Sequence, residues 1–336
     1  MHGRSCVDLV ASPPLYSQFL TEHFQQLINY GFVVPNPDSA WSSPVLFVPK
    51  PGQNRTLRSV VDLRYLNSQI RRRVYPMPHL HAVGEFLSNS TVLETLDAFK
   101  GFWQFPIGGA IESQSMLTPL GIVTPLCLPQ GNTNSVFAFQ QGMETIFRPS
   151  LTQSQLLIWI DDLLAHAASI EDLLAILQVI FESCKVRNLK LNALRCRQYL
   201  TEAKYCGRLY SAGTVRHDPA RIESLTVMPS PSNAADLMQF LCAATWISSH
   251  IPDFERHARP LRDLLEHLMQ GHATRSKAVA RRIPVLASTW TDAHDAAFKD
   301  TIHAISNSAT LHHPREEYDR CLFTDASLDS YSIIIT

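Results

Sequence analysis

The sequence predicts an α+β fold in which an antiparallel sheet carries helices on one of its faces. Before about residue 218, short apolar segments are separated by turn residues, without the regular strand-helix alternation of a doubly wound parallel sheet. Beyond that point apolar residues recur at helical spacing. With 336 residues, 45% of them hydrophobic, the chain is long enough for two or three domains with a sizeable core.

The elements before residue 218 follow from these patterns in order. Residues 15–31 have the spacing of an amphipathic helix that ends at Gly31. The expected elements that follow are a strand over SPVLFVPK, a strand over TLRSVVDLRYLN, a strand over 91–99, a helix over 134–147, a buried hairpin over 156–166 and a helix beginning near Ser169. PGQN, rich in turn residues, joins the first two strands and predicts that they form a hairpin.

The elements after residue 218 are mainly helical. SPSNAADLMQFLCAATWISSHIPDF predicts a helix capped by Ser232, and HARPLRDLLEHL a shorter one. Residues 269–284 are basic and poor in apolar residues, which predicts an exposed linker or insertion. A further helix over TDAHDAAFKDTIHAI leads to a closing strand pattern, CLFTDASLDSYSIIIT.

Composition excludes several classes of protein. The seven cysteines are scattered, odd in number and never form C-x-x-C, which argues against a disulfide framework and a zinc module. No apolar run reaches the ~18 residues of a membrane helix. The first residues, MHGRSCVDLVASPP, lack the apolar stretch of a signal peptide, so we expect a cytoplasmic or nuclear protein that does not contact a membrane.

Charge is distributed unevenly along the chain, although the net charge is only −1. Between Lys50 and Arg73 there are seven basic residues and one acidic residue, Asp62. A basic stripe of this kind can hold phosphates on a nearly neutral protein. A solvated basic face is the alternative.

Two adjacent aspartates interrupt the apolar segment LLIWIDDLLAH. Asp161 and Asp162 are flanked by apolar residues on both sides, which predicts that they lie at the end of a buried hairpin rather than in an ordinary solvated turn, the alternative reading. Neighbouring carboxylates at the edge of a core repel each other, and a divalent cation relieves that repulsion. If the strand that ends on Asp97 lies beside this hairpin, three carboxylates could hold two divalent cations roughly 3.5 to 4 Å apart, an arrangement that serves phosphoryl transfer.

Nine segments in succession give the chain a family resemblance. SPVLFVPK, LRSVVDLRYLN, YPMP, LDAFKGFWQFPI, LPQGNTNSVFAFQ, WIDD, LKLN, YCGRLYSAGTV and MQFLCAATWISSHIPDF occur in the order of successive blocks of one family. In these segments the chain resembles the reverse transcriptase of gypsy-type LTR retrotransposons, from about residue 20 to its end. The resemblance implies a right-hand polymerase of the DNA/RNA polymerase superfamily, with fingers, palm and thumb.

The resemblance also implies a catalytic metal site. Asp97, Asp161 and Asp162 match the catalytic aspartates of the family, and Ala98 would offer its backbone carbonyl to the metal. The implied cofactors are two Mg²⁺ ions, for which Mn²⁺ can substitute. The activity implied is RNA-directed DNA polymerisation, a nucleotidyl transfer.

Five further residues match family positions that contact the incoming nucleotide. Lys50 and Arg58 lie on the two strands that would fold over its triphosphate, and a guanidinium suits that bidentate contact better than an ammonium. Phe102 matches the aromatic residue that lies beneath the sugar and excludes a 2'-hydroxyl. Gln130 and Gly131 match the residues beside the sugar and base. Taken alone, Phe102 would more often be a core residue and Gln130 a turn residue.

Another five residues match family positions at the template, the primer or the leaving pyrophosphate. Asp62 and Arg64 match template-strand positions, and Cys206 with Gly207 matches the primer grip. Lys190 matches the lysine suggested as proton donor to pyrophosphate, although a lone lysine is usually solvated. The implied partners are therefore an RNA or DNA template with its primer and the deoxynucleoside triphosphates.

Three features depart from the family pattern. Trp159 stands where the family has tyrosine, and an indole is larger than a phenol and donates only through its ring nitrogen. The segment TWISSHIPDF lacks the basic residues that the family usually has ahead of IPDF, which predicts weaker template-primer binding. LFTDAS resembles the first strand of an RNase H domain, with Asp325 as a remnant of its first metal ligand, but 11 residues later the sequence ends. One carboxylate cannot form a two-metal site, so we expect no RNase H activity.

These expectations divide the chain into fingers and palm over 1–217 with a core at 43–211, a thumb-like helical region over 218–268, a linker or connection over 269–317 and a truncated RNase H-like start over 318–336. The natural reading is part of a retrotransposon Pol polyprotein, with RNase H and integrase domains in a longer precursor. The alternative is an inactive retroelement relic that binds nucleic acid weakly at most.

Overall fold

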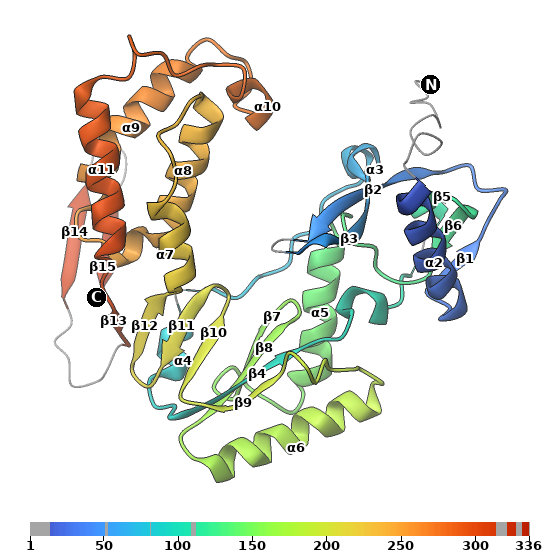
Figure 1. Ribbon diagram of the computed structural model, residues 1–336. Helices are drawn as coiled ribbons and strands as arrows, with labels where there is room; N and C mark the ends of the chain where they lie inside the picture. Colours follow the sequence, from blue (N-terminus) through green and yellow to red (C-terminus); the bar gives the residue numbers. More distant parts are fainter. Residues whose placement is uncertain are drawn as a thin grey trace. The chain divides into compact units, whose positions relative to one another are not determined.

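The computed structural model describes residues 14–50, 53–80, 82–108, 112–313, 321–326 and 331–335. For residues 14–16, 47–50, 53–58, 325–326 and 331–335 the description covers the backbone alone. The chain forms two compact units (Figure 1). Unit 1 comprises Met1–His79, Glu94–His166 and Ile170–Gln198, and unit 2 comprises Leu80–Leu93, Ala167–Ser169 and Tyr199–Thr336.

Unit 1 contains a five-stranded sheet in the order β1-β6-β5-β2-β3. Its strands are β1 (Val33–Pro35), β2 (Ser43–Lys50), β3 (Gln53–Val61), β5 (Met116–Thr118) and β6 (Gly121–Pro125). All neighbouring pairs are antiparallel except β2 and β5. Helix α2 (Pro14–Asn29), predicted over 15–31, packs Leu20, Phe24 and Leu27 against this sheet, because their spacing places all three on one face of the helix.

Strands β2 and β3 form the predicted hairpin, but the second strand is shorter than expected. It ends at Val61, and the rest of the predicted strand forms helix α3 (Arg64–Gln69). The Asp62 carboxylate accepts the Arg64 backbone N–H at 3.2 Å, and the buried residues Leu63 and Leu66 are three positions apart, as on one face of a helix. Asp62 therefore marks the change from strand to helix.

A four-stranded sheet in the order β7-β8-β4-β9 forms the other part of unit 1. It consists of β4 (Val92–Asp97), β7 (Leu156–Trp159), β8 (Asp162–Ala167) and β9 (Arg197–Leu200), close to the strand predicted over 91–99 and the hairpin predicted over 156–166. Helices α5 (Ser135–Phe147) and α6 (Ile170–Val186) lie beside it (Figure 1). Phe139, Met143 and Phe147 of α5 are fully buried. Two short 3-10 helices, η1 (Gly101–Gln104) and η2 (Glu112–Gln114), lie in the loops between β4 and β5.

Unit 2 contains an antiparallel sheet in the order β10-β11-β12-β13. Its strands are β10 (Glu202–Tyr205), β11 (Arg208–Ser211), β12 (Thr214–His217) and β13 (Leu311–His312). The short helix α4 (Val83–Leu87) packs closely against the residue after β13, since a Cβ on Gly84 would lie 3.2 Å from the His313 ring. Segments far apart in the sequence thus meet in this unit.

Helices α7, α8, α9 and α11 of unit 2 share one apolar core, and other helical segments lie beside them. The helical segments after β12 are α7 (Pro219–Thr226), α8 (Ala234–Ile247), η3 (Ser248–His250), α9 (Phe254–Met269), α10 (Lys277–Ala280) and α11 (Asp292–Ser306). Phe240 of α8, Leu261 of α9 and Phe298 of α11 are buried together, and the Phe240 and Phe298 ring centroids lie 4.6 Å apart. The helices predicted over 257–268 and 291–305 are therefore present, the first of them beginning earlier than expected.

One local expectation for this region was wrong, and another was only partly confirmed. Helix α8 is capped by Asn233 rather than Ser232, because the Asn233 side chain accepts the N–H groups of Ala235 and Asp236, whereas the Ser232 hydroxyl donates to Asp236. The segment 269–284 is mostly exposed, as expected, but it also contains α10, and Ala280 is buried against Ala234 and Ala235 of α8. The apolar residues of this segment are few, but they face the same side.

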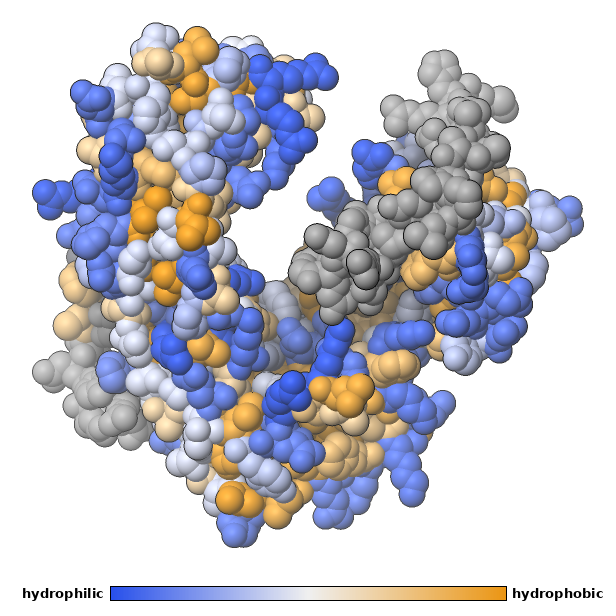
Figure 2. All heavy atoms as spheres, viewed as in Figure 1, coloured by the Kyte–Doolittle hydropathy of each residue, from blue (hydrophilic) through white to orange (hydrophobic). Residues whose placement is uncertain are grey.

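The last described strands, β14 (Leu322–Ala326) and β15 (Tyr331–Ile335), form an antiparallel hairpin within the closing segment predicted as strand. Asp325 pairs with Ser332 in its backbone register, and the Asp325 side chain lies outside the description. No helix in the described part of the chain is long and apolar enough to cross a membrane. On the face drawn in Figure 2, apolar residues occur in small groups among polar ones.

Candidate active site

The aspartate pair lies at the tip of the buried β7–β8 hairpin, as predicted. Trp159 pairs with Asp162, so Ile160 and Asp161 form a two-residue turn in which Ile160 has a φ of +54°. The strand residues on both sides, Leu156–Ile158 and Leu163–Ala165, are buried. The apolar arms therefore hold the turn rigidly at the edge of the sheet.

Asp97 ends β4, the strand that neighbours β8 in the sheet. The Ala98 backbone N–H donates to the Asp161 carbonyl at 3.3 Å, and the Asn192 N–H donates to the Asp97 carbonyl at 2.8 Å. The structure therefore joins the segment after β4 to the aspartate turn and to the loop after α6. These contacts bring together the three segments that carry Asp97, the aspartate pair and Lys190.

The three carboxylates repel one another. Burial, together with the negative charges of Asp161 and Asp97, raises the pKa of Asp162 to about 6. Burial also raises the pKa of Asp161, and the charge of Asp97 adds to this increase. The backbone N–H of Asp161 and the Arg195 guanidinium lower the same pKa. Electrostatic coupling of this kind favours a cation between the carboxylates.

Arg195, which the sequence analysis missed, supplies a positive charge at this site. Its Nη1 lies 3.3 Å from Asp97 Oδ2, and the Asp97 side chain is only 18% exposed. Among the residues that the structure describes, no three His, Cys, Asp or Glu side chains are gathered closely enough to hold a metal ion. The donor set itself fits a divalent cation, because it consists of carboxylate oxygens that repel one another, two at the tip of the hairpin and one at the end of the neighbouring strand.

Gln140 of α5 is a second residue that the sequence analysis missed. Its side chain is fully buried; Oε1 accepts the Ile160 N–H at 2.7 Å and Nε2 donates to the Ile158 carbonyl at 3.1 Å. Nε2 also donates to Glu144, which accepts the Tyr75 hydroxyl. A polar residue in phase with the apolar Met143 and Phe147 of the predicted helix was the signal that could have revealed it.

Phe102 and Lys190 lie on segments that Gln104 ties together. Phe102 is on η1, and its ring stacks on Phe139 with centroids 4.7 Å apart and planes inclined by 21°. Gln104 donates to the carbonyls of Phe99 at 2.6 Å and Lys190 at 3.0 Å, and its Oε1 accepts the Lys190 N–H at 2.6 Å. The loop after Asp97 is thus fixed against the loop that carries Lys190, whose side chain is exposed.

Gln130 and Gly131 lie beside the end of the β2–β3 hairpin. Asn67 of α3 donates to the Gly131 carbonyl at 2.8 Å, and Gly131 has a φ of +105° with room for no side chain beside the Val61 carbonyl. Gln130 is exposed. Glycine is therefore required at position 131 for both its backbone conformation and its close approach to β3.

Asp62 and Arg64, predicted as template-strand contacts, bind each other. Arg64 Nε and Nη2 donate to the two Asp62 oxygens at 2.8 and 2.6 Å, while the Arg64 side chain is 80% exposed. Lys50 is on β2 and Arg58 on β3, with Val48 opposite Arg58 in the register; the side chains of both basic residues lie outside the description. The two predicted triphosphate contacts thus share one hairpin.

The predicted primer-grip residues belong to unit 2. Cys206 and Gly207 form the two-residue turn between β10 and β11, with φ values of +48° and +79°. The aspartates belong to unit 1. The predicted metal and nucleotide residues thus belong to unit 1, and this turn belongs to unit 2.

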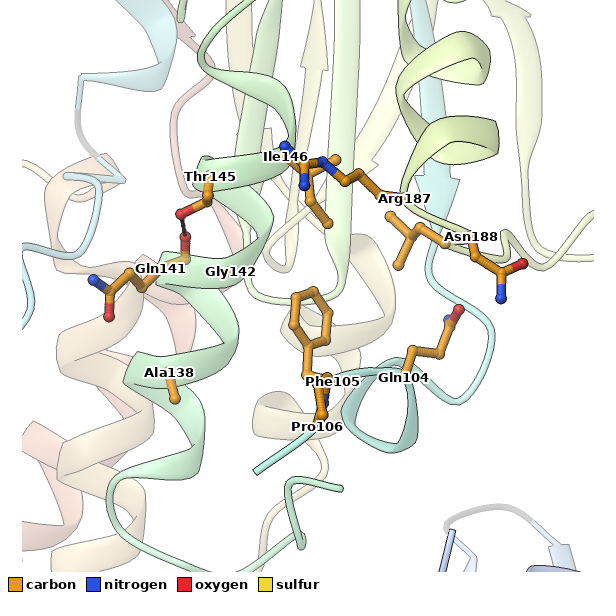
Figure 3. Close-up of a pocket in the computed structure, with 11 residues that line it drawn as sticks. Gln104, Phe105, Pro106, Ala138, Gln141, Gly142, Thr145, Ile146, Arg187 and Asn188 are labelled. Carbon is orange, nitrogen blue, oxygen red and sulfur yellow. Dashed lines mark hydrogen bonds between the residues drawn. The ribbon is translucent and has the colours of Figure 1, made fainter. Parts of the chain in front are cut away.

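A cavity of about 380 Å³ lies between η1, α5 and the residues after α6 (Figure 3). Phe105 points into it, and Gly142 of α5 is opposite, where a Cβ would come within 2.3 Å of the Phe105 ring. None of the three aspartates lines this cavity. The cavity is therefore distinct from the candidate metal site.

Known proteins resemble this chain in sequence. The family described as "Reverse transcriptase (RNA-dependent DNA polymerase)" matches residues 48–210. The retrovirus-related Pol polyprotein from transposon opus of Drosophila melanogaster is 26% identical over 306 residues, which are 90% of this chain and 30% of that polyprotein. The transposon Tf2-3 polyprotein of Schizosaccharomyces pombe is 25% identical over 255 residues, 76% of this chain and 19% of that polyprotein. The chain thus spans less than a third of either relative.

Solved structures share the fold at lower identity. The foamy viral protease-reverse transcriptase in complex with an RNA/DNA hybrid has a TM-score of 0.75 at 18% identity, over 96% of this chain and 41% of that one. The complex of its dRH form with double-stranded DNA gives the same TM-score and identity, over 94% and 52%. The chain therefore has a mixed α/β fold that resembles these reverse transcriptase structures, which confirms the expected mixture of helices and sheet. The family match over residues 48–210 includes all three aspartates.

Proposed function

We propose that the chain is the polymerase core of a retrotransposon reverse transcriptase that adds deoxynucleotides to a primer 3' end. One observation carries the proposal: Asp161 and Asp162 lie at the tip of a buried hairpin and are electrostatically coupled to Asp97 on the neighbouring strand. A solvated turn would not need buried arms or a third carboxylate. The match of residues 48–210 to the reverse transcriptase family supports the same reading.

Asp97, Asp161 and Asp162 would hold two Mg²⁺ or Mn²⁺ ions, with the Ala98 carbonyl as a further ligand. When bound, such ions lower the pKa of a hydroxyl nucleophile and neutralise a leaving pyrophosphate. The chain's own contribution is placement: Gln140 fixes the backbone of the aspartate turn, and the Ala98 N–H fixes the turn to the end of β4. The three side chains would still have to draw closer when the ions bind, because among the described residues no three such groups are gathered closely enough to hold one.

The nucleotide would bind beside these carboxylates. Lys50 and Arg58, on the two strands of one hairpin, would contact its triphosphate. Phe102 would lie beneath the sugar, held by its stacking on Phe139, which leaves the ring little freedom to make room for a 2'-hydroxyl. Gln130 and Gly131 would border the sugar and base.

The template and primer would contact residues of both units. Asp62 and Arg64 would contact the template strand, Cys206 and Gly207 would grip the primer, and Lys190 would be the proton donor to pyrophosphate. In the right-hand arrangement that we propose, fingers and palm occupy residues 1–217, a thumb-like region 218–268, a connection 269–317 and an RNase H-like start 318–336.

A catalytically inactive relic is the second candidate, and three observations favour it. Arg195 pairs with Asp97, so that one metal ligand is already neutralised. Trp159 closes the aspartate turn opposite Asp162, where its indole is larger than the tyrosine of the family pattern. Ser248 and Ser249 also stand in a helical segment where the family pattern has cations.

Primer extension tests the proposal directly. We expect the full chain to extend oligo(dT) on poly(rA) with Mg²⁺ or Mn²⁺, and Asp161→Asn to lose extension by at least about a hundredfold, because it removes a metal-binding charge while preserving the shape of the side chain. Asp300→Asn, which removes the same charge from the exposed face of α11, is the matched control and should remain active. Extension by Asp161→Asn at the normal rate would refute the site, and no extension by the folded wild type would favour the relic.

A further inference from the structure

A series of hydrogen bonds links Tyr75 to the aspartate turn. The Tyr75 hydroxyl donates to Glu144 Oε2 at 2.5 Å, and Gln140 Nε2 donates to Glu144 Oε1 at 2.8 Å. Gln140 in turn binds the Ile158 carbonyl and the Ile160 N–H beside the aspartate pair. Two side chains of helix α5 therefore connect the turn to Tyr75, which lies 69 positions before Glu144 in the sequence.

Glu144 determines the orientation of the Gln140 side-chain amide. A carboxylate only accepts hydrogen bonds, so it faces the amide nitrogen and not the amide oxygen. Because Nε2 is directed to Glu144 and to the Ile158 carbonyl, Oε1 accepts the Ile160 N–H at 2.7 Å. The reverse orientation would place the amide nitrogen against the Ile160 N–H, donor against donor. The conformation of the turn therefore depends on where the Glu144 carboxylate is held.

Tyr75 holds that carboxylate from its other side. One oxygen of Glu144 accepts from Gln140 and the other accepts from Tyr75, so each oxygen has a donor. The hydrogen bond to Glu144, with burial and the charge of the same carboxylate, raises the pKa of Tyr75 to about 12, so the phenol keeps its proton at neutral pH. A glutamate side chain has much rotamer freedom, and two donors restrict it more than one does.

The segment that carries Tyr75 is attached to the same helix. Pro76 follows Tyr75 and favours an extended backbone at the residue before it. Asn134, the residue before α5, donates to the Arg71 carbonyl at 3.0 Å and accepts the Arg73 N–H at 2.9 Å. The segment is thus fixed to α5 on both sides of residue 72, and the Tyr75 hydroxyl reaches Glu144 from a restrained backbone.

We propose that Tyr75 is a positioning residue of the candidate active site, which holds the aspartate turn in its conformation through Glu144 and Gln140. The turn contains Ile160 at a φ of +54°, which a β-branched residue rarely adopts without support. YPMP, which begins with Tyr75, is one of the segments of the family resemblance, and that resemblance gives this tyrosine no role. The consequence for activity rests on the proposed function, whereas the effect on the turn does not.

Hydrogen exchange at the Ile160 amide tests the proposal without any chemistry. This N–H donates to Gln140, so its exchange rate, measured by NMR on the full chain, reports directly on the turn. We expect Tyr75→Phe, which removes a single hydroxyl, to speed this exchange by about 3- to 10-fold. Tyr30→Phe removes a hydroxyl from a side chain that is 63% exposed and is the matched control, for which we expect no change.

A second variant tests whether Tyr75 acts through Glu144. Glu144→Gln keeps the length of the side chain but offers one acceptor oxygen instead of two, so it should also speed exchange at Ile160. The double variant should be no faster than the faster single one, because both substitutions interrupt the same series of hydrogen bonds. Effects that multiply would overturn the proposal, since they would show that the two residues act independently.

The exchange measurement also separates positioning from a general loss of stability. Thermal melting establishes that each variant is folded. In folded Tyr75→Phe, an Ile160 exchange rate equal to that of the wild type would overturn the proposal and leave Tyr75 as an anchor of its own segment. A rise of the same factor at the amides of β5 and β6, which belong to the other sheet of unit 1, would overturn it as well.

Primer extension measures the consequence for activity. If the proposed function holds, Tyr75→Phe should lower kcat by about 3- to 10-fold, leave the KM for the deoxynucleotide within about twofold, and have no further effect in a Gln140→Leu background. An unchanged kcat despite faster Ile160 exchange would overturn the positioning role. Faster exchange in a folded chain that extends no primer would support the effect on the turn and refute the polymerase. Extension by the wild type with unchanged Ile160 exchange in Tyr75→Phe would do the reverse.

Discussion

At the scale of single residues, the candidate active site is governed by how three carboxylates are neutralised. Arg195 pairs with Asp97, whereas Asp161 and Asp162 have no ion pair within the described chain and carry raised pKa values. A guanidinium and a divalent cation compete for the same oxygens. Arg195 therefore stabilises the cation-free site at the expense of metal affinity.

Replacing Arg195 should strengthen metal binding. Arg195→Gln removes a positive charge beside Asp97, and we expect the Kd for Mn²⁺, measured by electron paramagnetic resonance, to fall by about fivefold, equivalent to about 1 kcal/mol. Arg197→Gln, whose Nη1 binds the Leu194 carbonyl rather than a carboxylate, should leave the Kd unchanged. Equal Mn²⁺ affinity in both variants would show that Arg195 does not compete with the metal.

Glu94, three residues before Asp97 on strand β4, is a buried carboxyl group with a shifted pKa. Its carboxylate is fully buried without a hydrogen bond in the described chain, and burial raises its pKa to about 7 from 4.5. Between pH 4.5 and 7 the unfolded chain is ionised at this position while the folded chain retains its proton. Stability should therefore fall as the pH rises through that range, and the full penalty remains above pH 7.

Removing the buried carboxyl should stabilise the protein at alkaline pH. We expect Glu94→Leu to raise the melting temperature at pH 8 by several degrees and to have a smaller effect at pH 4.5, where the wild-type group is neutral in both states. Melting curves followed by circular dichroism at the two pH values measure the difference. A stabilisation of equal size at both would mean that ionisation of Glu94 is not its cause.

At the scale of elements, helix α5 positions the aspartate hairpin. Gln140 binds the backbone on both sides of Trp159 and is itself held by Glu144, one turn later on the same helix. The positive φ of Ile160 needs such support, because a β-branched residue rarely adopts it. A side chain on the helix therefore determines the conformation of the turn.

Loss of the Gln140 hydrogen bonds should lower turnover rather than substrate binding. Gln140→Leu leaves the Ile160 N–H and Ile158 carbonyl without their partner, so the turn should shift and kcat should fall by about 10- to 100-fold. The Kd for a primer-template duplex should not change. Gln141→Leu, on the exposed face of the same helix, is the control and should leave kcat unaltered. If the two variants showed equal kcat, Gln140 would have no positioning role.

At the scale of the whole molecule, the two units differ in their response to acid. Unit 1 contains Glu94 and Asp162, whose raised pKa values favour folding as the pH falls. Unit 2 contains His217 and His250, with ring centroids 4.0 Å apart and both rings buried. Because the pKa of His217 is lowered to about 3, its contribution to stability is complete above pH 6.5 and is lost progressively as the pH falls toward 3.

Acidification should therefore loosen unit 2 before unit 1. We expect hydrogen exchange, corrected for the intrinsic rate, to show weaker protection of β10–β12 and α7–α9 at pH 5 than at pH 7, while α5 and β7–β8 keep theirs. His217→Phe should reduce the difference, since it replaces a group that must be protonated on unfolding in acid with one that need not be. Equal loss of protection in both units would contradict this account.

The position of the aspartate pair and most elements could be predicted from the sequence, because they depend on local patterns. Apolar periodicity predicted α2, α5 and α11, and apolar flanks predicted that the aspartate pair lies on a buried hairpin. The boundary errors are equally local: strand-like composition concealed α3, which the Asp62 side chain initiates. Residue roles at the nucleotide and template positions remain proposals.

Only the tertiary structure decided which distant residues support those that were predicted. Arg195 and Gln140 act through contacts between elements far apart in the sequence, such as the 98 positions between Asp97 and Arg195. No local pattern encodes such a contact, because it depends on how strands are ordered in a sheet and which helix face packs on them. The sequence by itself determined the chemistry available to this protein, and the packing of its elements determined which side chains restrain that chemistry.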